Sequence, residues 1–396
     1  MPKLSVRDLA VRSKRVLVRV DFNVPLDDKG NVTDDTRIRA ALPTIEYLWQ
    51  NGARVILCSH LGRPKGRPDP KQSLRPVTQI LAELTHRPVA FVDNCIGDKV
   101  TKTVGIMKEG DILLLENLRF HAEEEKNDPE FARQLASLAD LYVNDAFGSA
   151  HRAHASTEGV TRFIKQSAMG LLMEKEVRYL RDELTNPARP FLVILGGAKV
   201  SDKIGVIESL LKKSDAFLVG GAMAYTFLKS QGIEIGNSRI EQDKLEAAKA
   251  ALAGAAEKKV RFLLPRDHLM ARKPEAGTER KTTDGVAIEA GWCGVDIGPQ
   301  TIAGFKHEIS QARTIFWNGP MGIFEIPEFA QGTFEVARAI AASGAKSIVG
   351  GGDSVTAVRK ARVAEKMSFI STGGGASLEL LEGIDLPGLA ALTDKD

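Results

Sequence analysis

From residue 191 the chain reads Phe191-Leu192-Val193-Ile194-Leu195, continues Gly196-Gly197-Ala198-Lys199-Val200-Ser201-Asp202-Lys203, and then has helical period from Ile204 to Lys213. Five apolar residues without alternation suit a strand that is buried on both faces, as in a parallel sheet. Two glycines then let the chain turn sharply into the helical segment. The stretch therefore predicts a strand, a glycine loop and a helix, the repeating unit of an α/β fold.

The same alternation recurs along the chain. Similar apolar runs, many of them β-branched, occupy Arg15 to Val20, Arg54 to Leu57, Asp111 to Leu115, Leu141 to Val143, Ala216 to Val219, Val260 to Leu264, Thr314 to Phe316, Lys346 to Val349 and Met367 to Ile370. Segments of helical period lie between many of them, at Thr36 to Gln50, Pro129 to Leu138, Gln242 to Ala256 and Phe329 to Ala342. Repeated β-α alternation predicts parallel sheets flanked by helices.

The length of the chain predicts two domains. Its 396 residues exceed the size at which one hydrophobic core usually stops growing. An amphipathic helix candidate, Met169 to Leu184, ends before Thr185-Asn186-Pro187, where proline stops a helix. We place the boundary there, which predicts an N-terminal domain at 1–170, a connecting helix at 171–186 and a C-terminal domain at 187–383. One large sheet is the alternative.

Composition limits the function classes. The formal net charge is only +3, with no block of lysine or arginine and few aromatic residues, which argues against nucleic-acid binding. No stretch is long and apolar enough to span a membrane, and the N-terminus lacks the apolar segment of a secretory signal, so a cytoplasmic protein is expected. The odd, separated cysteines Cys58, Cys95 and Cys293 favour buried free thiols.

Polar residues follow the first predicted strand. Asp21 and Asn23 come directly after it and before a proline turn. They can bind a hydroxylated ligand, or they can form an Asx turn that satisfies only local backbone groups. Spacing alone does not decide between the two.

Arginines occur repeatedly in the predicted strand-end loops of the N-terminal half. A single arginine is usually a solvated surface charge, but several at strand ends, two of them with histidine neighbours, favour one shared anion pocket. These residues are Arg37, Arg63, Arg119 and Arg152, with His60 as a further ligand and His151 and His154 as residues that orient their loop. Glu123-Glu124-Glu125-Lys126 reads as a solvated turn, and no histidine spacing indicates a metal site.

Glycine runs dominate the C-terminal half. Gly350-Gly351-Gly352-Asp353-Ser354 and Thr372-Gly373-Gly374-Gly375-Ala376 each follow an apolar run and open a helical one, which aims backbone amides at phosphate. Neither the P-loop nor the dinucleotide fingerprint occurs. Further candidates for a distributed nucleotide site are Gly197, Lys199, Lys203, Gly220-Gly221-Ala222, Trp292-Cys293-Gly294, Trp317-Asn318-Gly319-Pro320 and Glu325. Asp353 can cap its helix or hold Mg²⁺ that bridges phosphates, and the two roles are compatible.

These segments together resemble those of the phosphoglycerate kinase family, in the family's order and across nearly the whole chain. The matching motifs are Arg19-Val20-Asp21-Phe22-Asn23-Val24-Pro25, Ser59-His60-Leu61-Gly62-Arg63-Pro64, Glu116-Asn117-Leu118-Arg119-Phe120, Ala150-His151-Arg152-Ala153-His154, Gly196-Gly197-Ala198-Lys199-Val200-Ser201-Asp202-Lys203, Trp317-Asn318-Gly319-Pro320, Gly351-Gly352-Asp353-Ser354 and Ser371-Thr372-Gly373-Gly374-Gly375-Ala376.

The resemblance implies two Rossmann-like domains that face each other across a hinge cleft, with the tail at about 384–396 packing back on the first. It implies a monomeric glycolytic enzyme that transfers phosphate reversibly from 1,3-bisphosphoglycerate to MgADP. It assigns phosphoglycerate binding to Asp21, Asn23, Arg37, His60, Arg63, Arg119 and Arg152. It assigns the nucleotide side to Lys199, Lys203, Gly294, Asn318, Glu325 at the ribose, Gly351, Gly352, Ser354 and Asp353 at the magnesium, and we add Gly197 and Gly221 from the glycine loops.

Direct in-line transfer needs positioned positive charge rather than a covalent protein intermediate. Our hypothesis places Arg37, Lys199, Lys203 and the amides of Gly373, Gly374 and Gly375 around the moving phosphoryl group. Two rival functions are an NAD-dependent oxidoreductase, against which the absent dinucleotide fingerprint counts, and a nucleotide-responsive binding protein without catalysis, which only an assay separates from a kinase.

Overall fold

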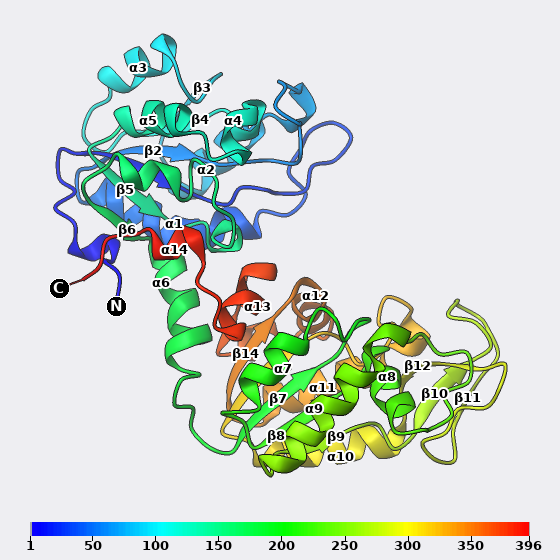
Figure 1. The fold of residues 1–396 in the computed structure, drawn as a ribbon. Helices are drawn as coiled ribbons and strands as arrows, with labels where there is room; N and C mark the ends of the chain where they lie inside the picture. The colour runs from blue at the N-terminus through cyan, green and yellow to red at the C-terminus, as the bar shows by residue number, and fades with distance from the viewer. Residues whose placement is uncertain (1, 396) are drawn as a thin grey trace. The chain divides into compact units, whose positions relative to one another are not determined.

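The computed structural model describes residues 2–395. The chain divides into two compact units, one that runs up to Val177 and takes the chain back from Asp385 onward, and one formed by Arg178–Ile384 (Figure 1). Each unit has its own six-stranded sheet. The alternative of a single large sheet is therefore wrong, and the predicted α/β fold with parallel sheets is confirmed.

All six strands of the first sheet run parallel, in the order β3-β4-β2-β1-β5-β6. The strands are β1 (Arg15–Arg19), β2 (Arg54–Cys58), β3 (Val89–Val92), β4 (Ile112–Leu115), β5 (Leu141–Asn144) and β6 (Ser167–Met169). The helices of this unit are α1 (Thr36–Gln50), α2 (Arg75–Thr85), α3 (Asp98–Gly105), α4 (Ala122–Glu125), α5 (Pro129–Ser137), α6 (Leu171–Val177) and, after the return of the chain, α14 (Pro387–Ala390). The strands that follow β1 in the chain are added first on the β2 side of the sheet and later on the β5 side. Open parallel sheets bind ligands at such a point of reversal.

The C-terminal tail is held to the first unit by backbone pairing. The Gly388 N–H donates to the Ala150 carbonyl at 2.8 Å, and the Asn144 side-chain amide donates to the Gly388 carbonyl at 3.0 Å. Leu4 N–H donates to the Thr393 carbonyl at 2.9 Å. Both ends of the described chain therefore belong to one unit.

The second unit repeats the architecture with the strand order β15-β14-β13-β7-β8-β9, again all parallel. These strands are β7 (Phe191–Leu195), β8 (Ala216–Val219), β9 (Arg261–Leu263), β13 (Thr314–Asn318), β14 (Lys346–Gly350) and β15 (Phe369–Ile370). A small antiparallel sheet adds β10 (His268–Ala271), β11 (Arg280–Thr282) and β12 (Cys293–Ile297). The helices are α7 (Ile204–Leu210), α8 (Met223–Ser230), α9 (Leu245–Glu257), α10 (Pro299–Gln311), α11 (Gln331–Ala342), α12 (Gly352–Lys360) and α13 (Gly375–Glu382).

Several elements differ from the sequence prediction. The expected connecting helix is a regular helix only over α6, and a π-helical turn continues it over Arg178–Asp182. The antiparallel sheet was not predicted, because β11 is exposed throughout and has no apolar run. Helices α2, α3, α8 and α10 were not predicted either. Six successive residues of α8 are buried, so it has no polar face to mark its period.

Burial of the central strands should dominate the stability of the first unit. Ile56 in β2 is fully buried, whereas Ile106 is 81% exposed. Ile56→Ala should lower the free energy of unfolding by about 2–5 kcal/mol, because it removes buried methyl groups and leaves a cavity. Ile106→Ala is the matched control, expected to stay within about 0.5 kcal/mol of the wild type in urea denaturation. Equal losses in the two variants would contradict this burial pattern.

Candidate active site

The loop after β1 holds the first polar pair. Asp21 accepts a hydrogen bond from Asn23 N–H at 3.2 Å and forms an ion pair with Arg37 from the start of α1. The Asn23 side-chain oxygen accepts from Gly62 N–H at 2.9 Å, which ties this loop to the one after β2. Burial alone would raise the pKa of Asp21, but the positive charges around it, including Arg37 and Arg19, hold its pKa below the usual value. The Asx turn forms, and the carboxylate still faces a guanidinium.

Arg119 reaches the same loop from the segment after β4. It is almost fully buried, donates to the Gly62 carbonyl at 2.8 Å and lies 3.2 Å from a carboxylate oxygen of Glu125. Its backbone N–H donates to the Asn117 side chain at 3.0 Å. A buried guanidinium held by a carbonyl and an adjacent carboxylate is fixed in position, which suits recognition of an anion.

The remaining arginines are more open to solvent. Arg37 keeps 38% of its side chain exposed, Arg152 is half-buried with its Nε 3.2 Å from His151 Nε2, and Arg63 is exposed beside Gly62. The hydrogen bonds and ion pairs therefore join Asn23 and Arg119 to Gly62, and they join Asp21 to Asn23 and to Arg37. Arg63 belongs to the group as the neighbour of Gly62. Burial, with smaller contributions from Arg19 and Arg152, lowers the pKa of Arg119.

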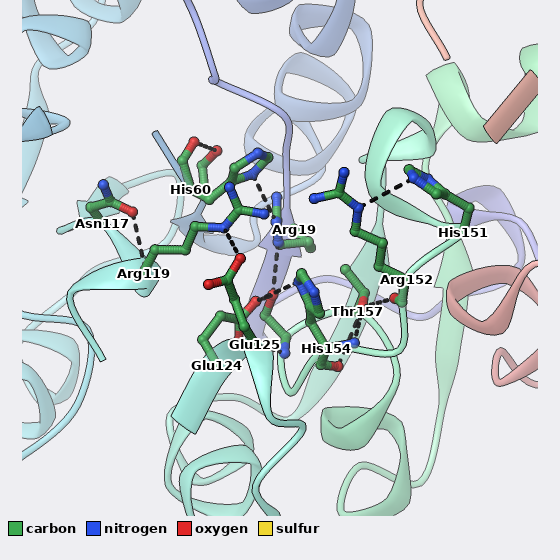
Figure 2. A network of polar contacts seen from close by, with 12 residues as sticks. Arg19, His60, Asn117, Arg119, Glu124, Glu125, His151, Arg152, His154 and Thr157 are labelled. Atoms are coloured by element: carbon green, nitrogen blue, oxygen red, sulfur yellow. Dashed lines mark hydrogen bonds and ion pairs between the residues drawn. The ribbon is translucent and has the colours of Figure 1, made fainter. Parts of the chain in front are cut away.

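His60 is buried, with its Nδ1 at 3.1 Å from Arg19 Nη2 (Figure 2). Burial, and then the charge of Arg19, hold the pKa of His60 well below its usual value, so the ring is neutral at physiological pH. Arg19 itself is 1% exposed although it is charged. No role was predicted for Arg19 from the sequence, although a charged residue within the apolar run of β1 was the available signal.

The expectation of a solvated turn at Glu123-Glu124-Glu125-Lys126 is wrong. The segment forms α4, and Glu124 is fully buried. Its two carboxylate oxygens accept from Ser156 Oγ at 2.6 Å and from Ser156 N–H at 2.9 Å. A run of carboxylates does not reveal which member turns inward, because that choice depends on partners contributed by a distant segment.

In the second unit the candidate residues gather at the carboxyl ends of three neighbouring strands. Asn318 at the end of β13 is in register with Leu195 of β7 on one side and Gly350 of β14 on the other. From β7 the chain adds β8 and β9 on one side of the sheet, and then β13, β14 and β15 on the other. The order of connection therefore reverses between β7 and β13, which is also a position where parallel sheets bind ligands.

Lys203 is directed at this edge. Its side chain is 8% exposed, and its ammonium donates to the Asn318 side-chain oxygen. Desolvation lowers the pKa of Lys203 to about 8, against the opposing charges of Asp202 and Asp353. The Asn318 side-chain nitrogen is buried and has no hydrogen-bond partner among residues 2–395. A charged donor and an orphaned amide donor together favour an anionic ligand at this edge.

Glycines let the backbone close around the same edge. Gly221, at φ +66°, packs on the loop after β7, where an added Cβ would lie 2.5 Å from Gly197 N. Gly351, at φ +86°, precedes α12, and an added Cβ there would lie 2.9 Å from the Asn318 amide nitrogen. Gly374, at φ +54°, precedes α13. Within the described residues neither helix start has a side-chain cap, which favours an anion at these helix starts. Before α13, however, the Gly373 N–H already donates to Ser371 Oγ and the Ala376 N–H donates to the Gly373 carbonyl, both at 3.1 Å.

The other nucleotide-side candidates are more peripheral. Lys199, Gly352, Asp353, Glu325 and the Gly374–Gly375 pair are exposed, and Gly373 is buried. Ser354 is buried and its hydroxyl accepts from Gly319 N–H at 2.6 Å. Gly294 lies in β12, where an added Cβ would be 2.0 Å from the Tyr225 hydroxyl. The next residue, Val295, accepts from Ile323 N–H at 2.9 Å, which places Gly294 beside the segment that carries Glu325.

A metal would have to share its ligands with a bound molecule. Among residues 2–395 no group of three or more histidine, cysteine or acidic side chains is placed to hold a metal ion. Asp353, exposed in the first turn of α12, fits a single carboxylate contact to Mg²⁺ carried by phosphates, the usual arrangement at phosphoryl-transfer sites.

None of the helices described between residues 2 and 395 has both the length and the apolar composition needed to cross a bilayer.

The fold is that of a two-unit α/β protein, with arginines in the strand-end loops of one unit and glycines and a buried lysine at the strand ends of the other. The family model for phosphoglycerate kinase matches residues 6–384. The chain is 59% identical to the phosphoglycerate kinase of Koribacter versatilis and 60% identical to that of Acidobacterium capsulatum, in both cases over all of this chain and all of the relative.

Solved structures agree with these relatives. The phosphoglycerate kinase of Coxiella burnetii superposes with a TM-score of 0.90 at 41% identity, and that of Pyrococcus horikoshii with 0.84 at 34%. Each comparison covers 98% of both chains. The chain belongs to the phosphoglycerate kinase family, whose members are kinases with a carboxyl group as phosphate acceptor.

The close approach of Gly221 to Gly197 should be essential to the phosphate edge. Gly221→Ala is expected to weaken ADP binding and to destabilise the second unit by more than the roughly 1–2 kcal/mol that a left-handed backbone alone costs an alanine. Gly232→Ala is the matched control, because Gly232 has φ +80° and nothing within 4 Å of an added Cβ. Calorimetric titration with ADP and thermal unfolding measure both effects. Indistinguishable behaviour of the two variants would contradict the proposed packing.

Proposed function

We propose that the two sites carry out reversible in-line phosphoryl transfer from 1,3-bisphosphoglycerate to MgADP, giving 3-phosphoglycerate and MgATP. The single observation that carries this proposal is the matching placement of the sites. In each unit, anion-binding groups of complementary chemistry lie at the carboxyl ends of central parallel strands where the strand order reverses.

The first unit binds the phosphoglycerate. Arg63, Arg119 and Arg152 bind its anionic groups, and Asp21 and Asn23 orient its hydroxyl end. His60 is a neutral hydrogen-bonding ligand because its pKa is held well below the physiological range. Arg37 is held in place by Asp21 and keeps solvent-exposed donors that can follow the transferring group.

The second unit binds the nucleotide. Gly197, Gly221, Gly294, Gly351 and Gly352 let the ligand approach the main chain. Lys199, Lys203 and Asn318 supply donors to its phosphates, with Ser354 holding the loop after β13 through Gly319. Glu325 binds the ribose, and Asp353 binds Mg²⁺ that the nucleotide carries; the ion neutralises phosphate charge when bound.

Catalysis in this scheme is positioning and electrostatic stabilisation. Arg37, Lys203 and Lys199, with the amides of Gly373, Gly374 and Gly375, surround the phosphoryl group, over whose oxygens negative charge spreads in transfer. Because the two substrates are bound by residues of different units, hinge bending must bring them together, which also excludes water from the reacting phosphate.

The enzyme is further proposed to act in the cytoplasm as a monomer on small molecules, with no nucleic-acid or membrane partner. Three buried, unpaired thiols, Cys58, Cys95 and Cys293, suit a reducing compartment. The small net charge gives no support to a nucleic-acid partner.

Arg37→Ala should lower kcat by about a hundred- to a thousandfold, because it removes one donor from the charge that develops on the phosphoryl group. Arg39→Ala is the matched control on the same helix, since Arg39 is mostly exposed and pairs with Asp35 at 2.8 Å. The assay follows MgATP-dependent phosphorylation of 3-phosphoglycerate, coupled to NADH oxidation. Unchanged turnover in Arg37→Ala, or equal losses in both variants, would show that Arg37 has no such role.

The depressed pKa of Lys203 gives a pH test. Because this pKa lies near 8 in the free protein, Lys203 loses its charge as the pH rises through that value. We expect kcat/KM for MgATP, which reports on free-enzyme groups, to fall about tenfold per pH unit above it. Lys203→Arg retains the charge and should remove this alkaline decline while lowering the overall rate. A flat wild-type profile across the alkaline range would exclude Lys203 as the required cation.

A further inference from the structure

A buried chain of polar side chains begins at Arg19, which contacts His60, and ends at Glu124 (Figure 2). It consists of Arg19 at the end of β1, Ser156 in the loop after β5, and Glu124 in α4, and all three are buried. Unpaired charges at this depth would be strongly destabilising, so the opposite charges of Arg19 and Glu124 depend on each other. Arg19 is absent from the ligand set proposed above, and so are Ser156 and Glu124.

The hydrogen bonds of this chain can have only one direction. Arg19 Nε donates to Ser156 Oγ at 2.8 Å, and the Ser156 hydroxyl donates to Glu124 at 2.6 Å. Burial raises the pKa of Glu124, and the charge of Arg19 and the two hydrogen bonds from Ser156 oppose that rise. Because a guanidinium can only donate, the serine oxygen accepts from Arg19, and its hydroxyl proton is directed at the carboxylate. Ser156 N–H adds a second bond to Glu124, which fixes the carboxylate from both oxygens.

The same reasoning sets the proton on His60. Arg19 Nη2 lies 3.1 Å from His60 Nδ1. Because the guanidinium has no acceptor, Nδ1 must be the unprotonated nitrogen, and the neutral ring then carries its proton on Nε2. The edge of His60 that is not bound by Arg19 therefore presents a hydrogen-bond donor.

We propose that Arg19, Ser156 and Glu124 are positioning residues that lock His60 in the neutral Nε2–H tautomer, so that it donates to an anionic oxygen of the bound phosphoglycerate. This inference rests on the proposed role of His60 in the first unit. Glu124 offsets the charge of Arg19. The Nδ1 atom of His154 lies 3.9 Å from Glu124 Oε1, the same carboxylate oxygen that accepts from the Ser156 hydroxyl. None of the three positioning residues needs to touch the substrate.

The tautomer can be read directly from the full-length protein without substrate. In ¹⁵N-labelled wild-type protein, histidine side-chain NMR should show His60 as one neutral species protonated at Nε2, assigned by comparison with His60→Gln. In Ser156→Ala, which removes the acceptor of Arg19 Nε, we expect a second tautomer or a protonated species to appear. The double variant Arg19→Met, Glu124→Met removes both charges together, which buried ion networks can tolerate without unfolding, and should show the same change. A wild-type proton on Nδ1, or unchanged His60 signals in both variants, would overturn the proposal.

Kinetics separate positioning from a general structural role. Ser156→Ala should raise KM for 3-phosphoglycerate roughly tenfold, the effect of weakening one hydrogen bond to a charged group, with kcat changed little. Ser167→Ala is the matched control: Ser167 is a buried serine of the same unit whose hydroxyl lies 3.3 Å from the Thr393 hydroxyl. An unchanged KM in Ser156→Ala, or an equal rise in Ser167→Ala, would overturn the positioning role. If wild-type protein transferred no phosphate, the proposed function would fail, and the NMR result would still decide whether the lock exists.

Discussion

Strands of a parallel sheet all end at the same edge, and this constraint determines where the candidate residues lie. In the first unit, the loops after β1, β2 and β4 meet at Gly62, through Asn23 on one side and Arg119 on the other. In the second, the ends of β7, β13 and β14 are in register at Asn318. Side chains more than a hundred residues apart become neighbours because the backbone ladder aligns the strand ends.

Burial then sets the chemistry of the charged groups at each edge. Lys203 is almost enclosed, so its ammonium is poorly hydrated and its pKa falls to about 8. A phosphate is a stronger partner for such a cation than the Asn318 oxygen that it now contacts. In the first unit, desolvation and Arg19 keep His60 neutral. One site thus presents a buried ammonium group with a lowered pKa, and the other presents a neutral imidazole beside the buried guanidinium group of Arg19.

Much of the fold could be predicted from the sequence, because continuous apolar runs such as Phe191–Leu195 mark strands buried on both faces. The helix at Thr36–Gln50 was predicted to the residue. Elements without such a signal were missed, among them the exposed strand β11. Motif residues such as Asp21 and Lys203 could be selected by type and position, and their functional roles stay predictions. The buried state of Glu124 could not be read from its sequence neighbours, because its partner Ser156 comes from a segment that only folding brings close.

The central claim is that the two sites pass a phosphoryl group directly from one bound substrate to the other. The most direct measurement is a rapid-quench single turnover of the purified chain with γ-³²P-labelled MgATP and 3-phosphoglycerate, followed by separation of protein and small molecules. The account predicts label in the acyl phosphate of 1,3-bisphosphoglycerate and none bound to protein at any time. Labelled protein that forms before product, or the absence of labelled acyl phosphate, would contradict it.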